Sequence, residues 1–256
     1  MSLSSLILRI TRKLTRPFGV DVVRYSSAPV VEVSTPWTWA SWQRNQLMQH
    51  HGIDLLFDVG ANNGGFGKEV RQHGYRGELL SFEPQHAAYE QLCAFAAKDP
   101  QWHTFHCGLG ESAGKATINL SANSVSSSLL PIEQALIETA PETAYVGQEE
   151  ITIRTLDNFW LEHKTKYDGR IIMLKIDTQG FEKQVLAGAT TFLSCVKLVQ
   201  LEMSLAELYT GQTLWLDMIA DLARLGFRQV VALTPGHHNI QTGELLECDA
   251  IFARSV

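Results

Sequence analysis

Short apolar runs alternate with amphipathic stretches along most of the chain from Ile53 onward. Such runs predict buried strands, and the amphipathic stretches between them predict helices that connect one strand to the next. We expect strands at residues 54–58, 78–82, 103–107, 171–176, 197–202, 227–232 and 248–253, and helices at 66–74, 85–98, 181–192 and 213–225. This order indicates an α/β fold with a mostly parallel sheet and helices on both faces.

Two segments interrupt the alternation. Residues 121–148 are polar and too long for a simple turn, and an insertion of this kind is often a functional lid. Residues 234–247 hold turn residues but no helical pattern, so the two strands around them should form an antiparallel hairpin at the sheet edge. Seven strands ending in such a hairpin are typical of the Rossmann-like class I methyltransferase sheet, whereas a nicotinamide-dependent dehydrogenase would have another crossover helix.

The first 36 residues differ from the rest. Residues 1–25 combine basic side chains with apolar ones at roughly helical spacing, which predicts a basic amphipathic helix, and residues 26–36 are typical of a linker. We therefore expect an appendage over residues 1–36 and a main domain over 37–256, whose first helix ends before His51. The appendage helix either packs on the domain or contacts a membrane surface or a partner. Its basic residues interrupt the apolar ones, unlike those of a secretory signal.

The composition narrows the class of protein. The chain has 256 residues, of which 45% are apolar and 19% charged, and this excludes disordered, collagen-like and coiled-coil proteins. The net charge of −6 argues against a dedicated nucleic-acid partner. The four cysteines form no C-x-x-C pair and indicate neither a zinc site nor a disulfide framework, so a cytoplasmic location is expected. No apolar run approaches the ~20 residues that span a bilayer.

An apolar strand that ends in Asp58 leads directly into a glycine-rich turn and a helix. Gly60 and Gly64 let the backbone turn sharply and approach a ligand closely. Asn62 stands where the dinucleotide fingerprint has its second glycine, so a pyrophosphate fits poorly. Asp58 would repel a pyrophosphate, but its carboxylate accepts hydrogen bonds from a cationic ligand that bears an amino acid.

A second acidic residue, Glu83, ends the next expected strand. It lies about 20 positions beyond the glycines, where a carboxylate accepts hydrogen bonds from both hydroxyls of a ribose. The two motifs together predict a cofactor that carries a nucleoside.

Ionisable residues also end two later strands. Lys175 and Asp177 share one face of their strand, as do Gln200 and Glu202, because side chains repeat every second residue. If the two strands are neighbours, these residues meet at the carboxyl edge of the sheet, where open α/β folds bind ligands. A lysine in an apolar strand needs a partner, so we expect a buried ion pair of Lys175 with Asp177 or Glu202.

The candidate catalytic residues are Lys175, Asp177 and Glu202. Asp177 is the first candidate to orient an acceptor or to take its proton, and His106, His237 and His238 are alternatives. Asp177, Glu182 and Glu202 are a conceivable set of metal ligands, but the nearby Lys175 argues against a metal.

The motifs together resemble the FkbM family of S-adenosylmethionine-dependent methyltransferases, from about Leu55 to Phe252. The resemblance rests on DVGANNG (58–64), SFEP (81–84), GLGESAGKA (108–116), SSSLL (126–130), RTLDNF (154–159), KIDTQGFEKQVLAGA (175–189) and LVQLEMS (198–204). One departure is Gln179, where the family often carries Glu.

The resemblance implies S-adenosylmethionine as the cofactor and assigns residues to its parts. It places the methionine part at Asp58, Gly60, Asn62 and Gly64, the ribose at Glu83 in the run that ends with Pro84, and the adenine at Gly108 and Leu109, at the end of the third strand. Asp177 would lie between cofactor and acceptor. Apart from the resemblance, Ser126, Ser127 and Ser128 either cover the cofactor, bind acceptor hydroxyls or belong to a flexible polar loop.

The implied reaction is methyl transfer to a hydroxyl of a sugar, polysaccharide or natural product, with a small molecule or glycan as the partner and no nucleic acid. Two other functions stay open. A nicotinamide-dependent oxidoreductase is disfavoured by Asn62 and by the terminal hairpin. The other is a non-catalytic partner-binding protein that retains the fold.

Overall fold

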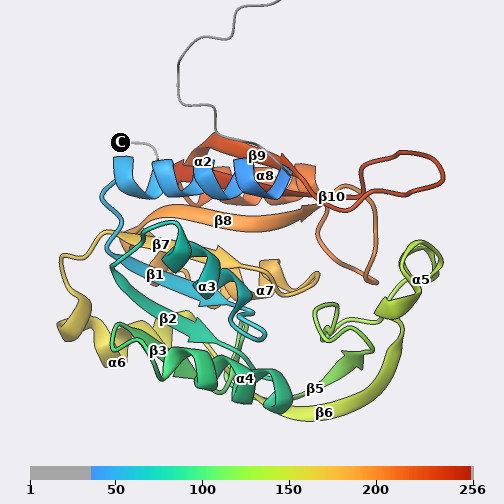
Figure 1. Cartoon of the computed structure of the whole chain (residues 1–256), viewed down its shortest axis with the longest axis horizontal. Coiled ribbons are helices and arrows are strands. Elements are labelled where there is room, and N and C mark those ends of the chain that lie inside the picture. Colours follow the sequence, from blue (N-terminus) through green and yellow to red (C-terminus); the bar gives the residue numbers. More distant parts are fainter. Residues whose placement is uncertain (1–35, 255–256) are drawn as a thin grey trace, which may run out of the picture. The chain divides into compact units, whose positions relative to one another are not determined.

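A seven-stranded sheet with the order β3-β2-β1-β7-β8-β10-β9 forms the centre of the structure (Figure 1). Its strands are β1 (Leu55–Val59), β2 (Glu78–Phe82), β3 (Trp102–Phe105), β7 (Ile172–Ile176), β8 (Val196–Ser204), β9 (Phe227–Pro235) and β10 (Glu247–Arg254). β10 is antiparallel to both of its neighbours, and the other pairs are parallel. The strand order changes direction between β1 and β7, and open α/β sheets bind ligands at such a point. The expected Rossmann-like sheet with its terminal hairpin is therefore confirmed, with β10 inserted between β8 and β9.

This computed structural model describes residues 36–254, with side chains from Trp39 onward. The appendage expected over residues 1–36 lies almost entirely outside the described residues, and the boundary at residue 36 stays a prediction. Within the described range, no helix has the length and apolar character required to cross a membrane.

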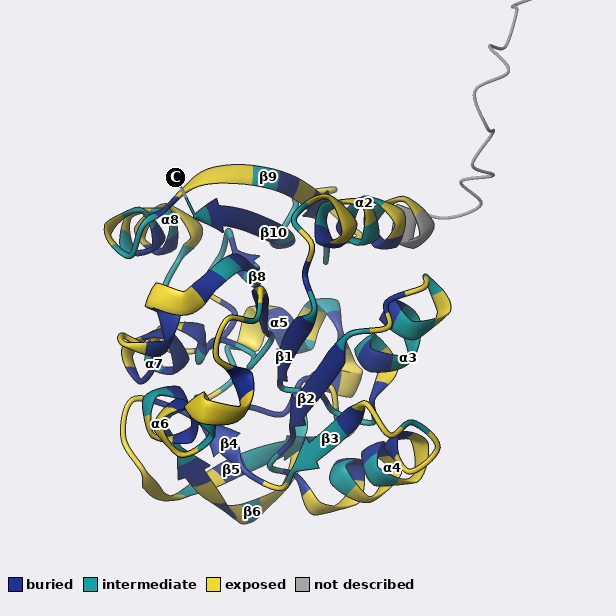
Figure 2. Cartoon of the chain, turned by 90° about the vertical axis from the view of Figure 1, so that its left-hand side faces the viewer, coloured by how far each residue is buried: buried dark blue, intermediate teal, exposed yellow. Residues whose placement is uncertain are grey.

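Helices cover both faces of the sheet (Figure 2). One face packs Leu56, Leu79 and Met173 against α2 (Pro36–His50), α3 (Gly65–Gln72) and α4 (His86–Ala96). The other face packs Phe57, Leu80 and Leu174 toward α6 (Leu156–Tyr167), α7 (Glu182–Ala187) and α8 (Trp215–Arg224). Successive residues of a strand point to opposite faces, so the side chains of each continuous apolar run pack into two separate cores.

The helix α6 is absent from the sequence expectations, which place no element at residues 156–167. Its signals are nonetheless present. Thr155 accepts a hydrogen bond from the backbone N–H of Asn158 at 3.1 Å and so caps the helix. Leu156, Phe159 and Trp160 follow at helical spacing and are buried. The helix expected at 181–192 is also wrong in length, because α7 ends at Ala187 and a separate 3₁₀ turn, Phe192–Cys195, follows.

A second sheet of three strands accompanies the first, with the order β4-β6-β5. Its strands are β4 (Gly108–Leu109), β5 (Gly114–Ser121) and β6 (Tyr145–Arg154). The third strand of the main sheet therefore ends at Phe105, and Gly108 and Leu109 belong to β4 instead. The segment expected to interrupt the fold contains α5 (Gln134–Thr139), a 3₁₀ turn (Pro141–Thr143) and the beginning of β6. In Figure 1 this sheet and α5 lie beyond the ends toward which β1 and β2 point.

Candidate active site

A cavity of about 380 Å³ opens at the carboxyl ends of β1, β2, β7 and β8, between the main sheet and the second sheet. Its size lies within the usual range of ligand sites, about 300–1,000 Å³. Eight of the eleven expected site residues line it: Gly60, Asn62, Glu83, Pro84, Gly108, Leu109, Asp177 and Glu202. The other three, Asp58, Gly64 and Lys175, do not line the cavity but support its wall.

The turn after β1 brings the backbone against β7. Gly60 has a φ of 72°, and a Cβ atom there would overlap the carbonyl oxygen of Asp177. Only glycine fits this position. Gly64 has a different purpose, because a Cβ atom there would lie 3.0 Å from Leu92 and 3.3 Å from Trp102. Gly64 therefore lets α3 begin close to the core. It does not line the cavity, and its contact with the cofactor stays a prediction.

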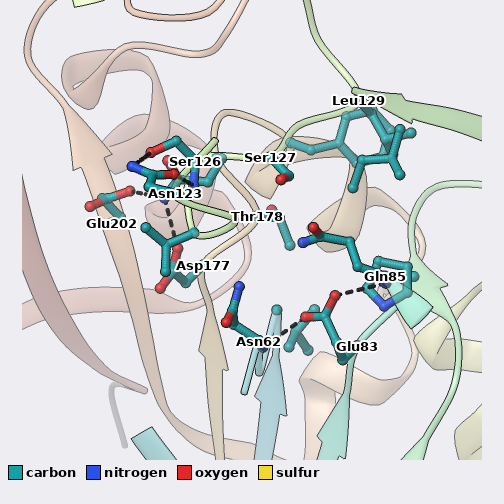
Figure 3. Close-up of a pocket in the computed structure, with 18 of the residues that line it drawn as sticks. Asn62, Glu83, Gln85, Asn123, Ser126, Ser127, Leu129, Asp177, Thr178 and Glu202 are labelled. Atoms are coloured by element: carbon teal, nitrogen blue, oxygen red, sulfur yellow. Dashed lines mark hydrogen bonds between the residues drawn. The ribbon is translucent and has the colours of Figure 1, made fainter. Parts of the chain in front are cut away.

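Glu83 lies on the cavity wall with only 2% of its surface exposed. Its two carboxylate oxygens accept hydrogen bonds from the backbone N–H groups of Asn62 (2.7 Å) and Gln85 (2.8 Å) (Figure 3). Burial raises the pKa of Glu83 to about 7, against the opposing effect of these two N–H groups. Each carboxylate oxygen has two lone pairs, so each retains acceptor capacity for a ligand hydroxyl.

Lys175 forms the expected buried ion pair, with one partner that the sequence did not suggest. Its Nζ lies 3.1 Å from the fully buried carboxylate of Asp58 and 3.5 Å from that of Asp177. It also donates a hydrogen bond to the carbonyl of Gly60 at 3.0 Å. Among the described residues no ion pair joins Lys175 to Glu202. Burial lowers the pKa of Lys175, but the two carboxylates outweigh this effect and the pKa is raised overall.

Lys175 and Asp58 therefore fasten the turn after β1 to the end of β7 from beneath the cavity. Asp58 also accepts a hydrogen bond from Ser81 at 3.1 Å, which fixes it further within the sheet.

Gln179 joins the two candidate catalytic carboxylates. Its side-chain amide donates to Asp177 at 3.0 Å and to Glu202 at 2.9 Å. Its amide oxygen accepts a hydrogen bond of 2.7 Å from the hydroxyl of the buried Tyr209. Sequence reasoning noted Gln179 only as a departure from the family. The three contacts now show that its amide holds Asp177 and Glu202 at a fixed separation.

Strained backbone positions gather at this cavity. Among residues 36–254, three residues other than glycine have positive φ angles: Asn62 (46°), Ser124 (60°) and Gln179 (54°). Asn62 and Gln179 line the cavity, and Ser124 accepts a hydrogen bond from Asn62 at 3.2 Å. Such conformations cost free energy and are found most often at functional sites.

Further carboxylates lie close to Glu202. Glu247 of β10 lines the cavity, Asp249 pairs with Glu202 across the strands, and Glu182 accepts hydrogen bonds from the backbone of Thr178 and Gly180. Burial, reinforced by repulsion among these groups, raises the pKa of Glu202 well above its ordinary value and that of Glu247 to about 8. The same effects raise the pKa of Asp249 to about 6.

The three serines of residues 126–128 follow β5 and are held by hydrogen bonds. Ser126 and Ser127 line the cavity, and Ser127 donates to the carbonyl of Ser124 at 2.9 Å. Ser128 is buried and donates to the backbone carbonyl of Gln179 at 2.6 Å. The segment after β5 is thereby attached to the loop after β7.

Of the three candidate histidines, His237 lines the cavity, where its ring lies 3.4 Å from the hydroxyl of Thr139. His106 stacks on Tyr89 with ring centres 4.5 Å apart, and neither it nor His238 lines the cavity. In the part of the chain that the structure describes, no group of three His, Cys, Asp or Glu side chains is arranged to hold a metal ion.

Residues 58–229, more than half of the chain, match the family described as the methyltransferase FkbM domain. The chain belongs to the FkbM methyltransferase family. It is a methyltransferase whose methyl donor is S-adenosylmethionine, and the resemblance found in the sequence is confirmed.

Several solved structures are similar to this FkbM methyltransferase at low sequence identity and with TM-scores below 0.5. Magnesium protoporphyrin IX methyltransferase from Synechocystis PCC 6803, solved with bound S-adenosylmethionine, is 10% identical with a TM-score of 0.43, covering 100% of this chain and 98% of that one. A putative RNA methyltransferase from Pyrococcus horikoshii is 12% identical with a TM-score of 0.42, covering 95% and 98%. A fibrillarin from Aeropyrum pernix is 10% identical with a TM-score of 0.44, covering 79% and 66%. No curated protein sequence matched the chain.

Proposed function

We propose that this FkbM methyltransferase methylates a hydroxyl oxygen of a sugar, polysaccharide or other natural product. The observation that carries the proposal is the pair of carboxylates, Asp177 and Glu202, held on the cavity wall by the amide of Gln179. A hydroxyl must lose its proton as the methyl group is transferred, and an amine acceptor with a free lone pair needs no such base. Two carboxylates fixed beside each other suit the oxygen acceptor.

The residues present fit the cofactor. S-adenosylmethionine supplies an electrophilic methyl group carried by a sulfonium. The turn at Gly60 and Asn62 admits a ligand close to the backbone and would hold the methionine part. Glu83 retains acceptor capacity for the ribose hydroxyls, as described above. Pro84, Gly108 and Leu109, on the same side of the cavity, would contact the adenine.

The two carboxylates have different environments and different proposed tasks. Asp177 is balanced by Lys175 and would orient the acceptor hydroxyl. Glu202 has no cationic partner among the described residues, and its raised pKa makes the ionised form a better base for a weakly acidic hydroxyl. We assign proton removal to Glu202. Lys175 would act by positioning Asp177 and the turn after β1.

The expected location and partners complete the proposal. The acceptor is a small molecule or glycan in the cytoplasm, and residues 1–36 either pack on the domain or contact a membrane surface or a partner. No nucleic acid takes part, in keeping with the net charge of −6.

The test is to incubate the protein with S-adenosylmethionine carrying a ¹³C-labelled methyl group and a panel of hydroxylated sugars and glycans, and to identify the product by NMR. The proposal predicts an O-methyl signal in the product. In Glu202→Gln the rate at which this signal forms should be about 100-fold lower, because a general base contributes about 10²–10⁴-fold to the rate. Glu111→Gln, on an exposed loop, is the matched control. Label found on nitrogen, or on RNA alone, would contradict the proposal.

A further inference from the structure

The ionisable side chains that line the cavity are nearly all acidic. Five carboxylates line it: Glu83, Glu142, Asp177, Glu202 and Glu247. None of the described lining residues is a lysine or an arginine, and His237 is the one lining side chain among them that can become a cation. A cavity with this lining repels anions and attracts cations.

The cofactor and the buried lysine account for only part of this charge. Glu83 lies on the side of the turn after β1, where the cofactor would bind, and Lys175 balances Asp58 and Asp177 from below. Glu142, Glu202 and Glu247 remain on the part of the wall left for the acceptor, without an ion pair among the described residues.

Glu247 shows the need for a partner most clearly. It is 92% buried, since its exposed fraction is 8%, yet it lines the cavity. Its only hydrogen bond among the described residues comes from Ser204 at 3.5 Å, and this bond reaches one of its two carboxylate oxygens. The other oxygen accepts no hydrogen bond from the described residues. A largely buried carboxylate that accepts one long hydrogen bond is costly to ionise, so its retention on a ligand-binding wall points to a ligand that supplies a cationic partner.

We propose that the acceptor carries a positively charged nitrogen, as an amino sugar or an amino alcohol does, and that Glu247 binds this group. The inference rests on the proposed function, because it names the acceptor class of the same site.

An organic ammonium fits the arrangement better than a metal ion. The carboxylates come from separate elements around the wall, and no three of the described acidic or histidine side chains converge as metal ligands. An ammonium group has three donors and tolerates partners that are spread apart. Its charge would also favour the ionised form of the neighbouring Glu202, which needs that form in order to accept a proton.

The same wall excludes acceptors of the opposite charge. A uronate or a phosphate would face Glu202 and Glu247 with no compensating lysine or arginine on the described part of the wall. Specificity of this kind arises from repulsion as much as from attraction.

The experiment compares three glucosides that differ in one group: 2-aminoethyl, 2-hydroxyethyl and carboxymethyl β-D-glucopyranoside. Each is titrated into the whole protein loaded with S-adenosylhomocysteine, and binding is followed by NMR. The pH is kept near 8, where the pKa of Glu247 lies. We expect the aminoethyl compound to bind at least tenfold more tightly than the hydroxyethyl compound, and the carboxymethyl compound to bind most weakly. In Glu247→Gln this preference should fall at least fivefold, while Glu111→Gln should retain it.

Equal binding of the three compounds, including no binding of any, would overturn the inference. An undiminished preference in Glu247→Gln would also overturn it. The same holds if Mg²⁺ displaces the aminoethyl compound from the wild-type protein but not from Glu247→Gln. The affinity for S-adenosylhomocysteine shows that each variant is folded and separates the two proposals. If the wild-type protein fails to bind S-adenosylhomocysteine, the proposed function fails with the inference; if it binds without a charge preference, only the inference fails.

Discussion

Glu83 is the residue whose charge this account links most directly to cofactor binding. Its carboxylate is held by the N–H groups of Asn62 and Gln85 and keeps capacity for ribose hydroxyls. We expect Glu83→Ala to weaken the binding of S-adenosylhomocysteine by roughly 1–3 kcal/mol, the usual range for a charge-assisted hydrogen bond. Calorimetric titration measures the change, with Glu111→Gln as the control. Unchanged affinity would remove Glu83 from the site.

The affinity should also depend on pH in a defined direction. The pKa of Glu83 is about 7, and Lys175 and Asp58 are the charged groups nearby. Hydroxyl donors favour the ionised carboxylate, so binding should release a proton and strengthen as the pH rises through 7. In Glu83→Gln the same titration should lack this increase. An identical pH profile in the two proteins would show that Glu83 does not bind the ligand.

Asp177→Asn separates a catalytic role from a structural one. The substitution keeps the shape but removes the charge that orients the acceptor, so kcat should fall by about 100-fold while cofactor affinity changes less. Lys175 retains Asp58 as a partner at 3.1 Å, so the protein should remain folded. Melting temperature and turnover are measured on one sample. A destabilised protein with normal turnover would leave Asp177 with a structural role only.

At the scale of residues, the sequence pattern predicted where side chains lie along the strands better than it predicted which other side chains they contact. The sequence placed Asp58 and Lys175 near strand ends, because a polar residue at the end of a continuous apolar run marks where a buried strand ends. It did not show that the two pair with each other, since the partner depends on β1 lying beside β7, residues more than 100 positions apart. The role of Gln179 was not predicted for the same reason, because all three groups that its side chain contacts are fixed by the tertiary fold.

At the scale of elements, the link between the segment after β5 and the loop after β7 is open to test. Ser128 makes this link through its bond to the carbonyl of Gln179. The Ser128 hydroxyl also accepts a hydrogen bond from the backbone N–H of Leu130 at 3.1 Å. We expect Ser128→Ala to lower the free energy of unfolding by about 1–3 kcal/mol, the net value of two hydrogen bonds, and to raise the KM for the acceptor more than that for the cofactor. Ser112→Ala, at an exposed serine on a loop, is the control. A KM that rises for neither substrate would show that the link does not shape the site.

The elements that the sequence missed have signals of their own. β5 and β6 bury Ile118, Ile151 and Ile153 in a small separate cluster. Ile151 and Ile153 are two positions apart, the spacing typical of one face of a strand. The pairing of β5 with β6 was not predicted, because the long polar segment between them suggests one insertion rather than two paired strands joined by a connection that contains a helix. The seven strands of the main sheet were easier to predict, since their apolar runs are buried on both faces.

At the scale of the whole molecule, the buried carboxylates should make stability fall as the pH rises. The pKa of Glu247 is about 8 in the folded protein, above its ordinary value of 4.5. Between these values the folded state holds a proton that the unfolded state releases, so each rise in pH favours unfolding. The acidic groups that repel Glu247 in the folded state are Asp177, Glu182, Glu202 and Asp249.

Glu247→Gln should therefore melt at a temperature that exceeds the wild-type value by little at pH 5 and by several degrees at pH 8.5. A gain of about 1 kcal/mol corresponds to roughly 2–4 °C in a domain of this size. Thermal unfolding followed by circular dichroism across this range measures the difference, and Glu111→Gln should show none. A difference that stays constant with pH would mean that Glu247 is ionised throughout.

The central claim is that this FkbM methyltransferase binds its cofactor at the carboxyl ends of β1 and β2 and has no site for a pyrophosphate. The most direct measurement is calorimetric titration of the whole chain with S-adenosylmethionine, S-adenosylhomocysteine and NAD. The account predicts binding of the first two, weakened in Glu83→Ala, and no binding of NAD, because Asn62 occupies the position where a dinucleotide site needs glycine. Tight binding of NAD with no response to S-adenosylmethionine would contradict it.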